Sequence, residues 1–263
     1  MHTADAQQWI SFALIAVWLV VAAVALSGRG RRPSRGVLIA TGASTLLFTG
    51  YAAVVDAVAD PAPLAGVDGP TLQWMIDHRT GPLDVIMVQV SNLGGTAGMT
   101  VLTVLGVGLL GWKGRYRDAV VVAVAGAVAG PLVNGFKHLY ARQRPPMATQ
   151  LVLEPTYALP SGHSLSSTVV VGILAVVTIR ALHSTVQRVL VGCAATAVVV
   201  TIGVSRLYLG VHWLTDVLAG WLLGGAWLSL CVAALLLGPA TTTPPPAPHL
   251  GTSCEARRAG SQR

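Results

Sequence analysis

Three short clusters of polar residues stand out in a chain that is otherwise strongly apolar. They lie at residues 137–145, 160–163 and 205–216, and each of them adjoins a long apolar segment. Together they contain lysine and arginine, which bind anions, and histidine and aspartate, which can transfer protons or attack an electrophile. If the fold brings the clusters together, these residue types predict an active site for an anionic substrate.

The third cluster contains a histidine and an aspartate at a helical spacing. His212 and Asp216 lie on one face of a helix start, where the carboxylate can fix the imidazole tautomer. The other ring nitrogen is then free to attack a substrate or to bind a metal. Arg206 precedes them across a turn that Gly210 permits, and its planar guanidinium suits phosphate oxygens. A purely structural pair at a helix end is the alternative.

The second cluster, Pro160-Ser161-Gly162-His163, immediately precedes an apolar run. The exposed amides in the first turn of a helix form an anion site. Ser161 can add a hydroxyl donor, and Gly162 permits the close approach of a ligand. His163 can pass a proton to a leaving oxygen. An ordinary capped helix start is the alternative.

The first cluster begins with Lys137 at the end of an apolar segment and continues with Arg142 and Arg144 before a proline pair. Such cations can bind a phosphate group, or they can extend along the segment to reach lipid headgroups. The cluster is therefore consistent either with function or with simple anchoring in the membrane.

A metal site is another interpretation of the histidines. His138, His163 and His212 with Asp216 offer enough ligands for one. However, several cations lie nearby in the sequence, and they would repel a divalent metal ion. We therefore predict a site with no metal and no other cofactor.

The composition is that of a membrane protein. Apolar residues make up 53% of the chain and charged residues 10%, whereas soluble domains carry about 25% charged residues. The formal charge of +7 therefore reflects short loops and a tail rather than a nucleic-acid-binding surface. Three cysteines indicate no disulfide framework. The first residues lack the lysine or arginine of a cleaved signal peptide.

Seven apolar segments predict an all-α, polytopic bundle of membrane helices. The third segment is long, and Gly94-Gly95 predicts a break between an interfacial helix at 83–94 and a span. The first segment either spans the membrane or lies on its periphery. The segments are 9–27, 37–58, 85–112, 118–136, 164–182, 187–205 and 213–237.

Basic residues in four regions agree on an orientation. Seven alternating spans place the loops around 29–35, 113–117 and 180–188, together with the C-terminal tail, on one side. The positive-inside rule assigns that side to the cytoplasm. All three clusters then lie on the outer side, where their cations break the rule, unless one span is miscounted. We expect a multi-pass plasma-membrane protein whose site faces outward.

We expect three regions along the chain. Residues 1–35 form an N-terminal span and a cytoplasmic loop, residues 36–238 form the membrane core, and residues 239–263 form a disordered cytoplasmic tail. Within the core, the acidic outer segment 61–84 either lies along the membrane interface or simply connects two spans.

Taken together, the clusters resemble the motifs of the type-2 phosphatidic acid phosphatase superfamily. These proteins are integral-membrane lipid phosphate phosphatases related in their core to vanadium haloperoxidases. The resemblance covers about residues 70–237 and implies a six-helix phosphatase core, to which this chain adds an N-terminal span. The matching patterns are Lys-x6-Arg-Pro at 137–145, Pro-Ser-Gly-His at 160–163 and Ser-Arg-x5-His-x3-Asp at 205–216.

The resemblance also implies a role for each motif residue. His212 would attack phosphorus to give a phosphohistidine, Asp216 would orient it, and His163 would protonate the departing oxygen. Fixed cations would neutralise the developing charge, so that no metal is needed. Arg142 and His138 lie inside the first motif but are not its defining positions. The residues implied to bind the phosphoryl oxygens are Lys137, Arg144, Ser161, Gly162 and Arg206.

The expected activity is hydrolysis of a lipid mono- or diphosphate that stays in the bilayer. Polyprenyl diphosphate, phosphatidic acid, phosphatidylglycerol phosphate and diacylglycerol diphosphate are the candidate substrates, and an outward-facing site favours the first or a broad lipid phosphatase. A phosphotransferase that uses another acceptor, and a non-catalytic lipid-phosphate binder or transporter, are the alternatives. The intact histidines count against the binder. No nucleic-acid partner is expected, and the oligomeric state stays open.

Overall fold

Eight α-helices account for most of residues 34–59 and 65–237, the parts of the chain that the structure, a computed structural model, describes. Neither range contains a strand, and the all-α prediction is confirmed there. The predicted span at 9–27 and the predicted tail at 239–263 lie outside the described residues. The helices are α2 (Arg35–Ala59), α3 (Asp68–Asp77), α4 (Gly81–Gly94), α5 (Thr96–Trp112), α6 (Tyr116–Tyr140), α7 (Gly162–Ala181), α8 (Thr185–Tyr208) and α9 (Leu214–Leu236).

The helices α2, α6, α7, α8 and α9 are each long and apolar enough to cross a membrane. The pair α4 and α5 passes the same test together, although the two helices meet at an angle of 50°. Gly95 lies between them in an extended conformation, with φ −72° and ψ 173°. The predicted break near Gly94-Gly95 is therefore confirmed. The described residues contain five candidate spans, or six with the bent pair counted as one.

Helix α7 lies at the centre of the bundle and packs against α5, α6, α8 and α9. Its side chains Leu165, Val169 and Ile173 are completely buried. Close packing against α9 depends on Gly220 and Gly224, because a Cβ atom at these positions would lie 2.7 Å and 2.9 Å from backbone oxygens of residues 161 and 165. This contact holds the start of α7 firmly against the start of α9.

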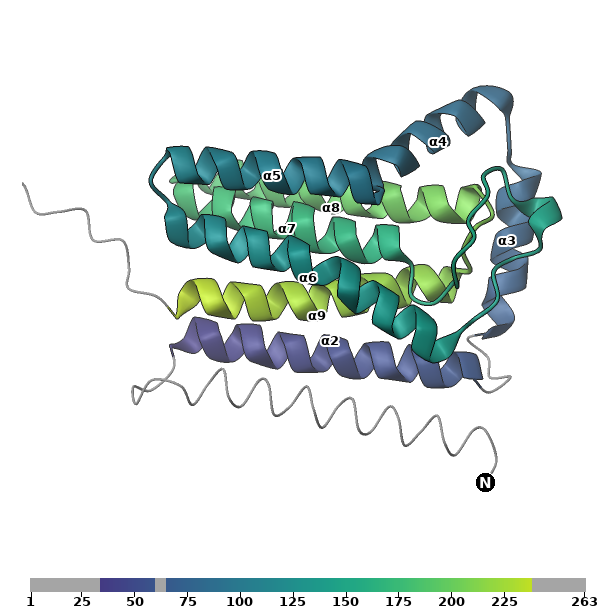
Figure 1. The fold of residues 1–263 in the computed structure, drawn as a ribbon, viewed down its shortest axis with the longest axis horizontal. Coiled ribbons are helices and arrows are strands. Elements are labelled where there is room, and N and C mark those ends of the chain that lie inside the picture. The colour runs from purple at the N-terminus through teal and green to yellow at the C-terminus, as the bar shows by residue number, and fades with distance from the viewer. Residues whose placement is uncertain (1–33, 60–64, 238–263) are drawn as a thin grey trace, which may run out of the picture.

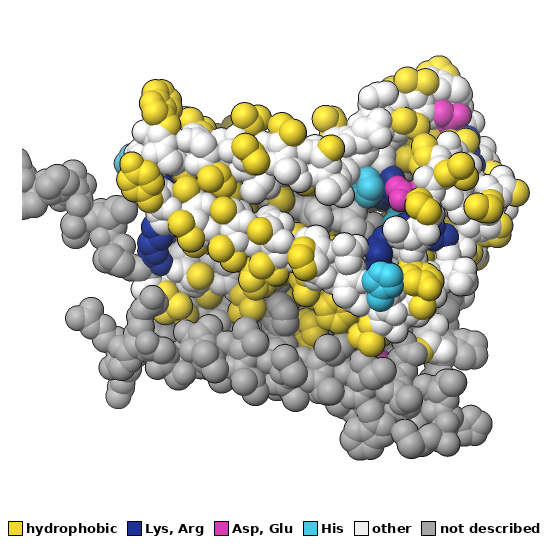
Figure 2. All heavy atoms as spheres, viewed as in Figure 1, with side chains coloured by type: hydrophobic (Ala, Val, Ile, Leu, Met, Phe, Trp, Pro, Cys, Tyr) yellow, Lys and Arg dark blue, Asp and Glu magenta, His cyan; other side chains and the backbone are white. Residues whose placement is uncertain are grey.

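The alternating direction of the spans brings the three clusters to one end of the bundle. Figure 1 shows α3 and the loop 141–161 lying across that end, beyond the spans. The C-terminal ends of α6 and α8 meet there with the N-terminal ends of α7 and α9. Basic, acidic and histidine side chains surround a hollow at the same end (Figure 2).

The turn between α8 and α9 has the geometry that Gly210 predicts. Its φ is +69°, a left-handed conformation that suits glycine. A Cβ atom here would also lie 2.3 Å from the carbonyl oxygen of Thr149 in the neighbouring loop. The turn reverses the chain within a few residues and places His212 directly before the first turn of α9.

Candidate active site

A cavity of about 250 Å³ opens at this end of the bundle, between α6, α7, α8 and the loop 141–161. Cationic and histidine side chains from all three clusters reach it, so the fold brings the clusters together around one space. The charged and histidine residues that line it are Lys137, Arg144, Glu154, His163, Arg206 and His212.

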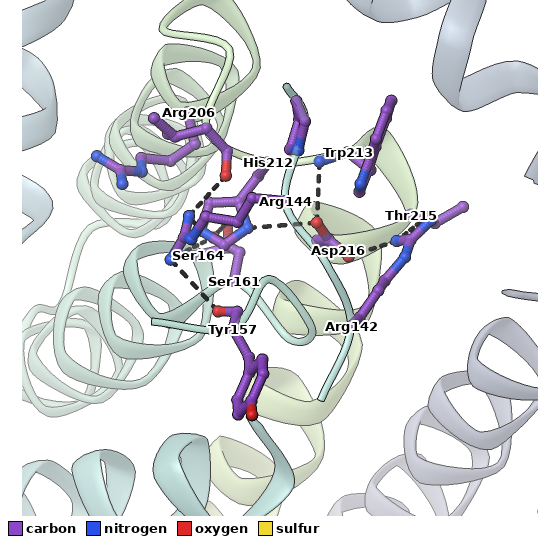
Figure 3. Close-up of polar contacts among 12 residues, drawn as sticks. Arg142, Arg144, Tyr157, Ser161, Ser164, Arg206, His212, Trp213, Thr215 and Asp216 are labelled. Atoms are coloured by element: carbon purple, nitrogen blue, oxygen red, sulfur yellow. Dashed lines mark hydrogen bonds and ion pairs between the residues drawn. The ribbon is translucent and has the colours of Figure 1, made fainter. Parts of the chain in front are cut away.

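His212 lies between a carboxylate and a guanidinium. Its Nδ1 is 3.4 Å from Oδ2 of Asp216, and its Nε2 is 3.1 Å from Nη1 of Arg144 (Figure 3). An ionised carboxylate only accepts hydrogen bonds, and a guanidinium only donates them. Nδ1 therefore carries the proton, and Nε2 presents its lone pair. This is the tautomer that a nucleophilic histidine requires.

Asp216 is completely buried, and its carboxylate accepts hydrogen bonds from other residues besides His212. Its Oδ2 accepts a hydrogen bond from the Trp213 amide at 2.9 Å, and its Oδ1 accepts a short hydrogen bond from Arg142. Arg142 also donates to Oδ2 of Asp68 at 2.8 Å. Asp68 in turn accepts from the amide and the hydroxyl of Thr215, at 3.0 and 2.7 Å. Arg142 thus links two buried carboxylates and stabilises the charge on both.

Lys137 and Arg144 share a partner on the loop. Nζ of Lys137 donates to the Thr156 hydroxyl at 2.9 Å, and Nη2 of Arg144 donates to the same oxygen at 3.1 Å. Arg144 is further held by the carbonyl oxygens of Thr156 and Val211, each at 2.6 Å. These contacts hold the two cations beside one small polar side chain at the cavity wall.

Arg206 is 2% exposed, and it enters the site from the last turn of α8. One of its terminal nitrogens donates a short hydrogen bond to Ser91 on α4. The other donates to Oε1 of Glu154 at 2.5 Å. Its Nε has no hydrogen-bond partner among the described residues, which leaves one buried donor unsatisfied.

The residues at the start of α7 differ in whether they line the cavity. Gly162 and His163 line it. Ser161 caps α7 and is completely buried outside the lining. Its hydroxyl oxygen accepts from the Ser164 hydroxyl at 3.1 Å, and its amide donates to the carbonyl oxygen of Asp216 at 3.0 Å. In this conformation Ser161 joins α7 to α9 rather than facing the space where an anion would bind.

The cations and the burial of the site control protonation. Burial, reinforced by Arg144 and Arg206, lowers the pKa of His212 well below its ordinary value, so the imidazole is neutral at physiological pH. For Glu154, burial acts to raise the pKa, but the attraction of the same two arginines outweighs it and holds the pKa below the usual range. The site therefore combines a neutral histidine with fixed positive charge and one ionised carboxylate.

A second, larger cavity of about 650 Å³ lies beside the first one, along α5, α6 and α7. Thr96, Gly130 and Ser166 line both cavities and mark where they join. Beyond these residues the wall is largely apolar and includes Val104, Val107 and Val170. A polar chamber rich in cations thus lies next to an apolar groove among membrane-spanning helices.

Some residues of the site are absent from the predicted set. Glu154 is the only acidic residue between Asp118 and Asp216. Its isolation among cations is the one feature of the sequence that could have identified it as a site residue. Asp68 looked like an ordinary outer-loop charge. Arg142 and His138, the two positions of the first motif outside its defining set, differ: Arg142 contacts Asp216 directly, whereas His138 lies outside the lining against the Tyr157 ring. Within the described residues, no three His, Cys, Asp or Glu side chains form a group that could hold a metal ion.

Comparison with known proteins assigns a family to this arrangement. Residues 118–236 match the PAP2 superfamily. The chain is 30% identical to phosphatidylglycerophosphatase B of Bacillus subtilis over 145 residues, which are 54% of this chain and 70% of that protein. It is 32% identical to undecaprenyl-diphosphatase of Sulfolobus acidocaldarius over 158 residues, 58% of this chain and 70% of that protein.

A solved structure shows a similar fold. The crystal structure of a transmembrane PAP2 type phosphatidylglycerolphosphate phosphatase from Bacillus subtilis superposes with a TM-score of 0.67 at 26% identity. The superposition covers 72% of this chain and 93% of that one. The bundle described above is therefore the transmembrane fold of that family.

Proposed function

The chain belongs to the PAP2 superfamily of membrane lipid phosphate phosphatases. We propose that it hydrolyses a lipid mono- or diphosphate through a phosphohistidine on His212, without a metal ion. One observation carries the proposal. A cavity lined by Lys137, Arg144 and Arg206 adjoins an apolar groove between membrane-spanning helices. Such a pair of cavities suits a molecule with a phosphate at one end and a hydrocarbon chain at the other.

The first chemical step uses the lone pair on His212. Nε2 attacks phosphorus while the bond to the lipid oxygen breaks, and Arg144 shifts its donor from Nε2 to a phosphoryl oxygen. The Nδ1 proton stays on the imidazole, and Asp216 stabilises the positive charge that the ring acquires. The guanidinium and ammonium groups around the cavity neutralise the charge that develops on the equatorial oxygens.

His163 acts at the leaving group and then at water. The anionic phosphate of the bound substrate favours the protonated form of His163. The imidazolium then donates its proton to the departing lipid oxygen, which otherwise leaves as a strongly basic alkoxide. The resulting neutral imidazole accepts a proton from a water molecule as that water attacks the phosphohistidine. Inorganic phosphate is released, and both histidines return to their starting protonation.

The same proposal covers the substrate class and the orientation. The relatives named above, a phosphatidylglycerophosphatase and an undecaprenyl-diphosphatase, support a glycerolipid phosphate and a polyprenyl diphosphate respectively. The excess of basic residues at the opposite end of the bundle supports an outward-facing site. A polyprenyl diphosphate, or a range of lipid phosphates that includes it, fits both considerations.

Phosphate release from a panel of lipids tests the proposal. Full-length protein in detergent is incubated with polyprenyl diphosphate, phosphatidic acid and phosphatidylglycerol phosphate in excess EDTA. We expect phosphate release from at least one lipid and inhibition by orthovanadate. Loss of activity with EDTA, restored by a divalent ion, contradicts the metal-free mechanism. Transfer of phosphate to an added alcohol at the expense of free phosphate indicates a phosphotransferase, and no turnover indicates a binder.

A further inference from the structure

One carboxylate lies inside the cavity that is proposed to bind phosphate. Glu154 is the only acidic residue among the described residues that line it. Its Oε1 is 2.5 Å from Nη2 of Arg206, and its Oε2 is 3.8 Å from Nη2 of Arg144. The side chain is 25% exposed, whereas those of the two arginines are 2% and 7% exposed. Glu154 therefore reaches two buried cations from the open side of the cavity.

The carboxylate uses a guanidinium donor that a phosphoryl group could also use. Of the five N–H groups of Arg206, one on Nη1 is bonded to Ser91, and the one on Nε has no partner among the described residues. Glu154 occupies Nη2. Carboxylate and phosphate oxygens bind a guanidinium with similar geometry. The two anions cannot use the same donor at once, and they repel each other at this distance.

The loop around Glu154 lets its side chain leave without unfolding any helix. The loop backbone is tied down on both sides, by Leu151 N–H to the carbonyl oxygen of Leu209 at 2.9 Å and by Ala158 N–H to that of Arg142 at 2.9 Å. Between these ties, Glu154 lies outside regular secondary structure. A rotation about its side-chain bonds towards solvent frees Arg206 while the cations of the site stay in place.

We propose that Glu154 is an internal counter-ion, which neutralises Arg206 and Arg144 in the empty site and is displaced by the phosphoryl group of the substrate. It thereby determines how tightly phosphate groups bind, and it returns to Arg206 as inorganic phosphate leaves. Its role in binding concerns any phosphate-like anion, and only its role in product release rests on the proposed function.

The test is binding of orthophosphate and of orthovanadate to the full-length protein in detergent, measured by titration calorimetry. Glu154→Gln keeps the size of the side chain and an acceptor for Arg206, but it removes the competing charge. We expect both anions to bind about tenfold more tightly to this variant. Asp77→Asn is the matched control, because Asp77 is exposed and its carboxylate accepts a side-chain hydrogen bond from Gln73, away from the cavity. It removes the same charge from the protein and should leave binding unchanged.

Unchanged or weaker anion binding in Glu154→Gln overturns the proposal. Unchanged binding would mean that the carboxylate has no effect on the anion, and weaker binding would mean that it holds Arg206 in position for the ligand. Glu154→Asp gives a second measurement, because the shortened acid keeps its charge but reaches Arg206 less well. We expect an intermediate affinity, and an affinity below that of the native protein contradicts the proposal. Calorimetry needs no turnover, so a failure of the proposed hydrolysis is seen separately in the lipid assay.

In the lipid assay Glu154→Gln should change KM and kcat differently. Tighter binding lowers KM for the lipid phosphate and lowers the inhibition constant for orthophosphate by a similar factor. The value of kcat should stay constant or fall, because the product leaves more slowly. A rise in KM with kcat unchanged identifies Glu154 as a residue that assists substrate binding and contradicts the role of counter-ion.

Discussion

Arg142 donates a short hydrogen bond to the buried carboxylate of Asp216, the residue that contacts His212. The same guanidinium donates to Asp68 at 2.8 Å, and its Cζ lies 5.8 Å from the centre of the Trp213 ring. Asp216 is therefore held in position from both sides, by the imidazole and by an arginine that a second carboxylate holds in turn. This chain of contacts joins the short helix α3, which contains Asp68, to the proposed nucleophile.

Arg142→Gln should lower kcat about 10- to 100-fold, with little change in KM. The loss follows because Asp216 would keep its burial but lose its cation, and would then orient His212 less well. Arg142→Lys should recover part of the loss, since the charge remains while the second hydrogen bond does not. Steady-state kinetics on a lipid phosphate measures both constants. The control is His138→Ala, whose side chain lies outside the cavity; an equal effect in that variant contradicts a specific role for Arg142.

The role of His163 can be separated from that of His212 by the choice of leaving group. His163→Gln should reduce turnover of an alkyl lipid phosphate about 100- to 10,000-fold, the usual contribution of general acid catalysis. With p-nitrophenyl phosphate the loss should be much smaller, because nitrophenolate leaves without a proton. His212→Ala should abolish turnover of both substrates. Equal losses in His163→Gln on the two substrates contradict its assignment as the acid.

The pH dependence should follow the lowered pKa of His212. The unprotonated imidazole is the active form, and burial with the nearby cations holds its pKa well below the ordinary value. Activity should therefore persist as pH falls through about 6.5, the ordinary histidine pKa, and decline only in more acidic solution. Arg144→Gln removes a cation beside the ring, which raises the pKa of His212 and moves the acid limb to higher pH.

That comparison is measured as kcat/KM against pH for both proteins with one substrate, so that the ionisation of the substrate phosphate affects them equally. An acid limb in Arg144→Gln at the same pH as in the native protein, or at a lower pH, contradicts the assignment of that limb to His212.

The apolar groove can be filled without disturbing the helices around it. A Cβ atom on Gly108, which lines the larger cavity alone, would have no heavy atom within 4 Å, so a leucine there can project into the groove. Gly108→Leu should raise KM for a long-chain lipid phosphate at least tenfold, by an order-of-magnitude estimate from the apolar contact that is lost. Hydrolysis of the tail-less p-nitrophenyl phosphate should change little. Gly111→Leu, at an equally open position outside the groove, is the control. Equal effects of the two variants contradict a tail-binding groove.

The orientation of the site can be read from single cysteines at the two ends of the bundle. Leu153 on the loop beside the site is 79% exposed, and Trp112 at the opposite end of α5 is 83% exposed. With Cys193, Cys231 and Cys254 replaced, Leu153→Cys should react with a membrane-impermeant maleimide in intact cells. Trp112→Cys should react only after the membrane is permeabilised. The reverse pattern contradicts an outward-facing site.

The sequence by itself determined the class of fold and the identity of most of the proposed site. The length and hydropathy of a span, the flexible pair Gly94-Gly95 and the spacing of His212 and Asp216 are local properties, and neighbouring residues are enough to predict them. The order of the three clusters along alternating spans then required them to meet at one end of the bundle. That requirement is topological and holds whatever the details of packing.

The tertiary structure decided which other side chains face those residues. Asp68 and Glu154 come from segments without a motif, and only the folding of α3 and the loop 141–161 over the end of the spans brings them to Arg142 and Arg206. Packing of α7 on α9 likewise turned Ser161 away from the cavity. These contacts join residues far apart in the chain, and their geometry depends on how whole helices pack. Sequence spacing carries no information about that packing, and for this reason only the folded chain reveals a carboxylate inside its own anion site.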